Sequence, residues 1–415
     1  MRVFFSVGEP SGDLHGANLI RALRAQHPDW EFVGYGGPKM ASAGCQLHAD
    51  LTQLAVMWVA QVVWNIHKFL GLLSRADRYF RHQKPDLVVL IDYPGFNWWI
   101  ARRAKARGIP VVYYGTPQLW AWASWRVGKM RRYVDHVLCK LPFEEAWFRQ
   151  RGCRATHVGH PYFDELRAQT PDRSLMEQLD TAGRPLVTIL PGSRTQEVRS
   201  NLPSLLQAAG RIQQRVPSAR FAIAAYKQTQ LEFIHNAVRQ SGVSAAVHVG
   251  RTAELIQSAK CCLACSGSVS LELLYHTRPS AILYQVSRLG YLVQSLFRKV
   301  RYITLVNLLT AEDPFAERGA GIYDPDDPRD QHVLMPEYLT CEDRSAQLAE
   351  HIVDWLTDES CYKNLQQQLS ALKERVAGGG ASQRAAQYIT ALLEDNGETS
   401  QHALHGFSAA SADAA

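Results

Sequence analysis

The sequence contains no run of about eighteen uncharged apolar residues, which is the length that a membrane-spanning helix requires. Its first residues, Met1 to Ser6, lead directly into a strand-like segment. They lack the long apolar region and the small-residue cleavage site of a signal peptide. These two absences predict a cytoplasmic protein that does not span a bilayer.

Cysteine is present but lacks regular spacing. The eight cysteines therefore predict neither a disulfide framework nor a zinc motif. Cys261, Cys262 and Cys265 form the one close set, in an apolar stretch typical of a parallel strand. We interpret them as small buried thiols rather than as a metal or redox centre.

A strong excess of one charge is also absent. The 45 basic and 39 acidic side chains leave a net charge of +6, which permits an acidic ligand or a membrane surface and does not require nucleic acid. We expect no nucleic-acid partner.

The stretch from Ala101 to Arg132 contains basic residues and no Asp or Glu, and it includes three tryptophans. Its interpretation stays open between a face for anionic lipid or phosphate, with aromatic anchors, and a solvated helix face. The residues concerned are Arg102, Arg103, Lys105, Arg107, Arg126, Lys129, Arg131 and Arg132, with Trp120, Trp122 and Trp125.

The length of 415 residues exceeds one ordinary core and suits two cores of roughly 150 to 200 residues. Short segments rich in Val, Ile and Leu alternate with amphipathic helical stretches, which is the pattern of βαβ units. The expected strands are 3–7, 32–35, 87–91, 111–114, 134–139 and 156–158, then 186–190, 221–225, 246–249, 261–265 and 280–284. Three more helices are expected at 345–357, 362–377 and 382–394.

This pattern predicts an α/β protein with two Rossmann-like domains that face a cleft. The N-terminal domain is expected to span residues 1–165 and the C-terminal domain residues 184–360, because turn-rich sequence separates them. Residues 361–396 are expected to form helices that pack on the N-terminal domain or on a partner subunit. Residues 397–415 are expected to be a disordered tail.

Small residues follow one strand of the second domain. Ser266, Gly267 and Ser268 lie between a strand and a helix whose first amides and positive dipole end suit a diphosphate. Glu272 lies further along that helix, where a carboxylate can reach ribose hydroxyls. The alternative is a serine N-cap followed by an ordinary helical glutamate.

A second turn of this kind, Pro191-Gly192-Ser193-Arg194, follows the strand at 186–190. Arg194, with Ser193 beside it, is a candidate to bind phosphate through two parallel hydrogen bonds. The alternative is a surface arginine at the start of a helix.

In the first domain, Asp92 ends the apolar strand at 87–91, and open α/β sheets bind ligands beyond the carboxyl ends of such strands. Restricted solvent access can move the pKa of a carboxylate into the range of a general base. Asp92 is therefore the first candidate to accept a proton from an acceptor hydroxyl. Glu9, Asp13 and His15 surround the first βα turn, where His15 is a rival base and Asp13 can orient another group. The alternative is that these residues cap helices.

Two apolar stretches fall short of a membrane span. Residues 54–73 include Trp58 and Trp64 but are interrupted by polar side chains, and residues 284–309 mix apolar with basic side chains. Each is either a helix packed in the core or an interfacial segment that contacts lipid or an acyl chain.

Short sequence blocks between residues 3 and 309 resemble, in the same order, those of the bacterial lipid-A-disaccharide synthases. The blocks that carry the resemblance include Gly8-Glu9-Pro10-Ser11-Gly12-Asp13, Gly36-Gly37-Pro38-Lys39-Met40, Ile91-Asp92-Tyr93-Pro94-Gly95-Phe96-Asn97, Pro117-Gln118-Leu119-Trp120-Ala121-Trp122, Leu141-Pro142-Phe143-Glu144, Val158-Gly159-His160-Pro161, Leu190-Pro191-Gly192-Ser193-Arg194 and Val306-Asn307-Leu308-Leu309.

The resemblance implies the GT-B architecture and an inverting glycosyl transfer. A 2,3-diacylglucosamine group would pass from its UDP ester to 2,3-diacylglucosamine 1-phosphate, giving a β-1,6-linked disaccharide phosphate and UDP. Asp92 would be the base, the amides of 266–268 and Arg194 would stabilise the leaving diphosphate, and Glu272 and Asn307 would lie at the nucleotide. No metal or other cofactor is expected. Acylated substrates imply a peripheral position on the inner face of the cytoplasmic membrane, and a homodimer is left open.

The chain also departs from the family pattern. Trp58 and Gln61 stand where the family usually has Gly and Glu, and Gln285 stands where a basic residue often follows the matching Tyr. An insertion-like stretch at 311–335 has no counterpart that we identify. Three alternatives therefore stay open: a GT-B enzyme for another UDP-sugar, a sugar-nucleotide epimerase, and a non-catalytic protein that binds nucleotide sugar or membrane.

Overall fold

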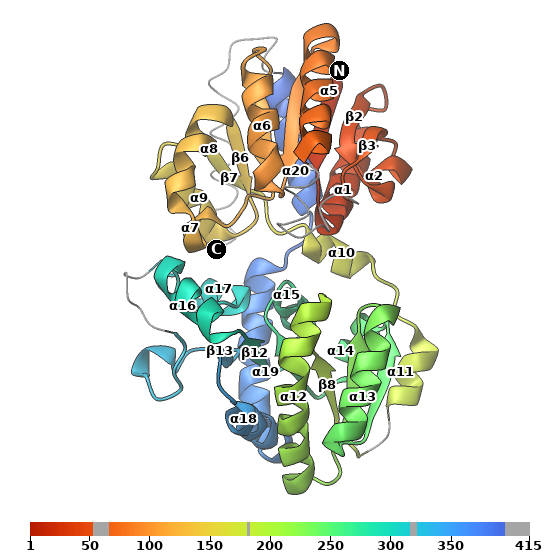
Figure 1. Cartoon of the computed structure of the whole chain (residues 1–415), viewed down its shortest axis with the longest axis vertical. Helices are drawn as coiled ribbons and strands as arrows, with labels where there is room; N and C mark the ends of the chain where they lie inside the picture. The colour runs from red at the N-terminus through yellow and green to blue at the C-terminus, as the bar shows by residue number, and fades with distance from the viewer. Residues whose placement is uncertain (53–65, 181–182, 316–321, 395–415) are drawn as a thin grey trace. The chain divides into compact units, whose positions relative to one another are not determined.

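The computed structural model describes residues 1–52, 66–180, 183–315 and 322–394. It divides into two compact units, coloured in Figure 1 along the chain. The first unit is Met1–Glu165 with the segment that begins at Gly379, and the second is Leu166–Gly378.

Each unit contains one sheet in which all strands are parallel. The first unit has β1 (Arg2–Val7), β2 (Glu31–Gly36), β3 (Gln46–Asp50), β4 (Leu87–Ile91), β5 (Val111–Tyr114), β6 (His136–Cys139) and β7 (Ala155–His157), in the order β3-β2-β1-β4-β5-β6-β7. The second has β8 (Leu186–Leu190), β9 (Arg220–Ala225), β10 (Ala245–Val249), β11 (Cys261–Cys265), β12 (Ser280–Gln285) and β13 (Glu337–Thr340), in the order β10-β9-β8-β11-β12-β13. Both orders are doubly wound Rossmann orders.

Helices connect the strands of the first unit. They are α1 (Pro10–Gln26), α2 (Pro38–Ser42), α5 (Ile66–Gln83), α6 (Pro94–Lys105), α7 (Leu119–Trp122), the 3-10 turn η1 (Ser124–Arg126), α8 (Val127–Tyr133), α9 (Pro142–Arg149) and α20 (Ala381–Glu394), while α10 (Tyr162–Ala168) runs across the boundary. Residues 54–65 of the expected apolar segment and the expected tail at 397–415 lie outside the described residues.

The second unit has its own set of helices. They are α11 (Arg173–Leu179), α12 (Thr195–Arg215), η2 (Gln228–Gln230), α13 (Leu231–Ser241), α14 (Thr252–Ser258), α15 (Val269–Tyr275), α16 (Arg288–Phe297), α17 (Leu305–Thr310), η3 (Pro328–Asp330), α18 (Ser345–Thr357) and α19 (Glu359–Val376). Of the C-terminal helices, α19 belongs to the second unit and α20 to the first.

The eleven expected strands are present, and each strand end lies within two residues of the predicted one. Central strands such as Leu87–Ile91 are buried along their whole length, so they read as unbroken apolar runs. Two strands were not predicted. β3 is polar and partly exposed at the sheet edge, and β13 has only four residues.

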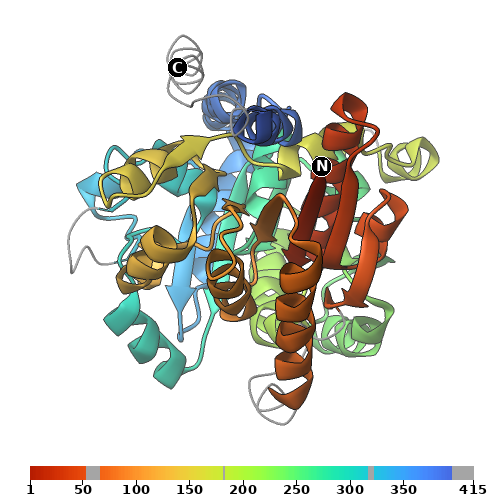
Figure 2. The same cartoon turned by 90° about the horizontal axis from the view of Figure 1, so that it is seen from above.

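Helix α20 returns the end of the chain to the first sheet. It packs beside α1 (Figures 1 and 2), and its buried face includes Ala385, Ile389 and Leu393. Tyr388 Oη lies 2.8 Å from His136 Nδ1, which ties the helix to β6. The core of the first unit therefore includes residues from both ends of the described chain.

No helix in the described part of the chain is long and apolar enough to cross a membrane.

Candidate active site

In both sheets the strand order reverses beside the first strand, between β1 and β4 in one unit and between β8 and β11 in the other. Open α/β sheets bind ligands beyond the carboxyl ends of the strands at such a switch point. The predicted residues follow these strands: Glu9 after β1, Asp92 after β4, Ser193 after β8 and Ser266 after β11. The candidates thus lie at the two switch points.

The turn that carries Asp92 has an unusual backbone. Asp92 and Tyr93 both have a φ of 45°, in the left-handed region that residues other than glycine rarely adopt. The carbonyl of Asp92 accepts hydrogen bonds from Tyr113 Oη at 2.6 Å and from Asn97 Nδ2 at 2.8 Å. A Cβ at Gly8 would lie 2.3 Å from the Tyr93 ring, so a glycine is needed there. Together these contacts fix the backbone from which the Asp92 carboxylate extends.

Lys140 is the ion-pair partner of Asp92. It follows β6, and its Nζ lies 3.1 Å from Asp92 Oδ1, with the two side chains only 13% and 18% exposed. Burial alone would lower the pKa of Lys140, but the carboxylates of Asp92 and Glu144 outweigh it and raise that pKa above its ordinary value. Sequence reasoning missed Lys140, because the pair is 48 residues apart in the chain and nothing around Lys140 marks it as a partner.

His15 is buried on α1, with 5% of its surface exposed. Its Nδ1 has no hydrogen-bond partner among the described residues, and its ring meets that of His160 edge to face at a centroid distance of 6.3 Å. Burial lowers the pKa of His15 to about 4, with Asp92 and Lys140 acting in opposite directions. His15 is therefore a neutral imidazole near pH 7.

Asp13 and Glu9 hold the first helices in place. The Glu9 carbonyl accepts the Asp13 N–H at 2.8 Å as α1 begins. The buried Asp13 carboxylate accepts three backbone N–H groups around the start of α2, from Gly37, Lys39 and Met40 at 2.9, 3.0 and 3.0 Å. This geometry favours the orienting role for Asp13.

Trp120 corrects one sequence expectation. We expected it to be an aromatic anchor at the surface, and this is wrong: Trp120 is 2% exposed and its Nε1 donates to Glu144 Oε1 at 2.9 Å. The other carboxylate oxygen of Glu144 accepts the N–H groups of Lys140 and Leu141 at 2.9 and 3.0 Å. Burial raises the pKa of Glu144, although these contacts oppose it. Both side chains are thus part of the interior.

In the second unit, Glu197 shapes the turn after β8. Its Oε2 accepts the N–H groups of Ser193 and Arg194 at 3.2 and 3.0 Å, and its Oε1 lies 2.9 Å from Arg194 Nη1. A Cβ at Gly192, whose φ is 128°, would lie 2.6 Å from the Glu197 Cβ. The Arg194 side chain is 79% exposed, so its guanidinium is accessible to an anion.

Asn201 joins three strand ends of the second sheet and was not predicted. Its Nδ2 donates to the Pro191 carbonyl at 3.2 Å and lies 3.1 Å from Cys265 Sγ, while its Oδ1 accepts the Gln285 N–H at 2.8 Å. It follows Glu197 by one turn of α12, a spacing that could have marked it as facing the same strand ends.

The turn after β11 contains Ser266, Gly267 and Ser268. Ser266 Oγ donates to the Ile303 carbonyl at 3.3 Å, and Gly267 has a φ of 152°. Ser268 directly precedes α15, whose first turn is stabilised by Ser270 Oγ donating to the Gly267 carbonyl at 2.9 Å. The turn therefore leads into the start of a helix, as the sequence predicted.

Glu272 and Asn307 are both buried within the second unit. Asn307 Nδ2 donates to the Met335 carbonyl at 2.7 Å and to Glu337 Oε2 at 2.8 Å, and its Oδ1 accepts the Met335 N–H at 3.1 Å. Burial raises the pKa of Glu337 to about 7, against the hydrogen bonds that it accepts. The Asn307 amide is thus fully used inside the fold.

Metal-binding side chains are not grouped in the described ranges: no three His, Cys, Asp or Glu residues there are placed to hold a metal ion.

Comparison with known proteins gives a consistent family match. A family model described as lipid-A-disaccharide synthetase matches residues 3–371. The lipid-A-disaccharide synthase of Myxococcus xanthus is 32% identical over 393 residues, covering 94% of this chain and 97% of the relative. That of Alkalilimnicola ehrlichii is 36% identical over 355 residues, covering 84% of this chain and 92% of the relative.

Solved structures share the fold at low sequence identity. A putative UDP-N-acetylglucosamine 2-epimerase from Listeria monocytogenes has a TM-score of 0.62 at 10% identity, over 96% of this chain and 97% of that one. CalG4, the calicheamicin glycosyltransferase, has a TM-score of 0.55 at 14% identity, over 96% and 99%. The fold is therefore that of the two-Rossmann GT-B glycosyltransferases and of these epimerases.

The buried imidazole of His15 predicts that acid destabilises the protein. Its pKa is about 4 when folded, against an ordinary value of 6.5. The unfolded chain therefore binds the proton first, and the free energy of unfolding falls as the pH drops from 6.5 toward 4. One pKa unit is worth about 1.36 kcal/mol, so this group lowers the free energy of unfolding by about 2 kcal/mol at pH 5.

Urea unfolding at pH 7.5 and at pH 5 measures how much the free energy of unfolding falls with acid. His15→Gln is expected to reduce that fall by the contribution of His15. The matched control is His235→Gln, at an exposed position of α13. An equal pH dependence in the parent and in His15→Gln would contradict the prediction.

Proposed function

The chain belongs to the lipid-A-disaccharide synthase family, and from that premise we propose which residues carry out the family's reaction. It is a glycosyltransferase that transfers 2,3-diacylglucosamine from UDP-2,3-diacylglucosamine to 2,3-diacylglucosamine 1-phosphate. The products are a β-1,6-linked disaccharide phosphate and UDP. The observation that carries this conclusion is the family match over residues 3–371, a range that contains both switch points.

Incubation of the purified protein with both acylated substrates, followed by mass spectrometry, tests the reaction. The disaccharide phosphate and UDP are the expected products. An epimerised UDP-sugar without disaccharide would instead point to the activity named for the epimerases that share the fold.

Asp92 is assigned as the general base. Its carboxylate forms an ion pair with the Lys140 ammonium, with Asp92 Oδ1 and Lys140 Nζ 3.1 Å apart. It would take the proton of the acceptor hydroxyl as that oxygen attacks the anomeric carbon from the face opposite UDP. His15 is the rival base, because it is neutral and its Nδ1 has no partner in the described part of the chain.

The second unit is assigned to the UDP leaving group. The exposed guanidinium of Arg194 and the backbone amides of 266–268 suit a diphosphate, because charge grows on the leaving oxygen as the sugar departs. Glu272, on the helix that follows, is assigned to the ribose hydroxyls. Asn307, whose amide is used by Met335 and Glu337, is assigned a positioning role.

A peripheral contact with an anionic membrane is proposed for one face of the first unit, which we call the α6–α8 face. Trp99, Trp122 and Trp125 are exposed there. Lys105 and Arg107 are paired with Asp135 and Asp77, so they contribute little net charge. The exposed cations of this face are Arg102, Arg103, Lys129, Arg131 and Arg132. Aromatic side chains beside exposed cations fit the headgroup region of an anionic bilayer.

Helix α16 supports a second lipid contact, on the other unit. None of its residues is buried, and five large apolar side chains on it are 45–73% exposed. No Asp or Glu occurs between residues 286 and 310, whereas Arg288, Arg298 and Lys299 lie at the helix ends. In Figure 1, α16 lies at the outside of its unit. An exposed apolar face of this kind suits lipid or the acyl chains of the donor.

Asp92→Asn is expected to lower turnover by roughly 10²- to 10⁴-fold with little change in UDP affinity, because the amide cannot accept the proton. Asp86→Asn is the matched control, since Asp86 lies just before the opposite end of the same strand. Turnover near that of the parent would remove Asp92 from the mechanism.

Arg194→Ala is expected to weaken UDP binding by about 1.5–3 kcal/mol, the range for a hydrogen bond to a charged group. The measurement is a calorimetric titration with UDP. Arg199→Ala removes an exposed charge from the same helix, where the guanidinium stacks on Phe233, and it should bind UDP like the parent. Equal affinity in both variants would contradict the assignment.

Binding to anionic vesicles is expected to depend on salt. The protein should sediment with them at low ionic strength and be largely released at about 1 M salt, where the Debye length is about 3 Å. Changing Arg126, Lys129, Arg131 and Arg132 to Gln should remove most of the salt-sensitive fraction, because Arg102 and Arg103 are then the exposed cations left on the face. The control variant changes Arg173, Arg184, Arg239 and Lys363 to Gln and removes the same charge elsewhere. Equal sedimentation of the two variants would show that the basic stretch is only a solvated face.

A further inference from the structure

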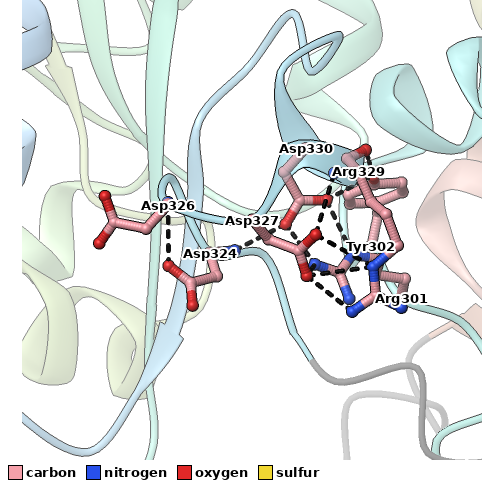
Figure 3. Close-up of polar contacts among 7 residues, drawn as sticks. All are labelled: Arg301, Tyr302, Asp324, Asp326, Asp327, Arg329 and Asp330. Carbon is pink, nitrogen blue, oxygen red and sulfur yellow. Dashed lines mark hydrogen bonds and ion pairs between the residues drawn. The ribbon is translucent and has the colours of Figure 1, made fainter.

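The insertion-like stretch at 311–335 contains an acidic segment, residues 324–330, which we call the acidic brace. It includes four aspartates and is followed closely by β13. Figure 3 shows two of them, Asp327 and Asp330, beside Arg301, whereas Asp326 points away from it. None of the residues assigned to the proposed reaction lies in this segment.

Asp330 is the centre of those contacts. Its side chain is fully buried, and its two oxygens accept Arg301 Nε at 2.7 Å and Nη2 at 2.5 Å. Tyr302 Oη donates to Asp330 at 2.7 Å, and so does the Asp324 N–H. Asp327 adds an ion pair with Arg301 at 2.9 Å. The brace therefore binds two consecutive residues, Arg301 and Tyr302. The two parallel hydrogen bonds from Arg301 restrict the orientation of its guanidinium relative to Asp330.

The next two residues are held from the other side by Glu337 on β13. Its carboxylate accepts the Ile303 N–H at 2.6 Å and the Thr304 N–H at 2.9 Å. The Ile303 carbonyl in turn accepts the hydroxyl of Ser266 at 3.3 Å. A short path of direct contacts thus runs from Asp330 through residues 301–303 to the turn after β11.

We propose that the acidic brace positions the Ser266 turn through residues 301–304 and so sets the affinity of the enzyme for its UDP-linked donor. Asp330 and Arg301 are positioning residues in this proposal, because neither is required to touch the ligand. It rests on the proposed role of residues 266–268 in binding the diphosphate. A displaced Ile303 carbonyl would move the Ser266 hydroxyl that it holds, and the amides of the same turn would move with it.

Asp330→Asn tests the proposal, with Asp326→Asn as the matched control that makes the same charge change in the same segment. Loss of a hydrogen bond that holds the turn is expected to weaken UDP binding about fivefold. The KM for the UDP-linked donor should rise by a similar factor, while kcat and the KM for the acceptor stay close to those of Asp326→Asn. UDP affinity in folded Asp330→Asn equal to that of the control would overturn the proposal.

Thermal unfolding separates this effect from a general loss of structure, because both variants are compared below their transitions. If Asp330→Asn does not fold, Arg301→Lys replaces it, since lysine keeps the charge and loses the two-pronged geometry. UDP is then titrated into Arg301→Lys, and an affinity for UDP equal to that of the control overturns the proposal. If Arg194→Ala weakens UDP binding and the brace variants do not, the brace alone is wrong. If Arg194→Ala has no effect either, the proposed UDP site fails as well.

Discussion

In each sheet, the side-chain amide of a buried asparagine forms hydrogen bonds with backbone groups at the switch point. The candidate site residues follow the strands that this amide joins. Asn97 donates to the Asp92 carbonyl at 2.8 Å, and Asn201 donates to the Pro191 carbonyl and accepts the Gln285 N–H. At a switch point the connections leave the two strands in opposite directions, so backbone groups just beyond the strand ends need partners outside the ladder. A buried group left without one costs about 1–3 kcal/mol. One amide in each unit therefore stabilises the strand ends and fixes the turns that carry the proposed chemistry.

The hydrogen bonds also distinguish two kinds of residue: those whose polar groups are bonded within the fold, and those whose polar groups can bind a ligand. The carboxylates of Asp13 and Glu144 and the amide of Asn307 are used by neighbours inside the fold, and a ligand would have to break those bonds to reach them. Asp92 and Arg194 each have one ion-pair partner among the described residues. The Arg194 side chain is 79% exposed, and exposed pairs contribute little stability, so its pair with Glu197 can be exchanged for a ligand at a small cost. The pair of Asp92 with Lys140 is largely buried, so breaking it costs more. Arg194 is therefore the more able of the two to change partners, whereas Lys140 holds the Asp92 carboxylate in place.

The sequence was enough to predict most strands of both sheets and the turns that follow them, because both follow from local patterns. Unbroken apolar runs mark buried parallel strands, and small residues after such a run mark a strand end. Contacts between distant segments were not predictable. Nothing near Lys140 reveals its partner. The spacing of Asn201 from Glu197 indicates a shared helix face but not its distant partners, Cys265 and Gln285. Trp120 looked like a surface aromatic because its hydrogen-bond acceptor, Glu144, lies 24 residues away. β3 was missed because a polar, half-exposed edge strand has no apolar run.

The acidic brace shows why a long insertion can precede an edge strand without disturbing it. Among the strands that the structure describes, β13 pairs with β12 alone, and a slip of one residue would turn its inward side chains to the opposite face. Glu337 would then lose Ile303, Thr304 and Asn307 together. A buried ion pair adds little net stability compared with apolar packing, but it tolerates only one geometry. The pair of Asp330 with Arg301 therefore acts less as a source of stability than as a constraint on where the insertion ends and β13 begins.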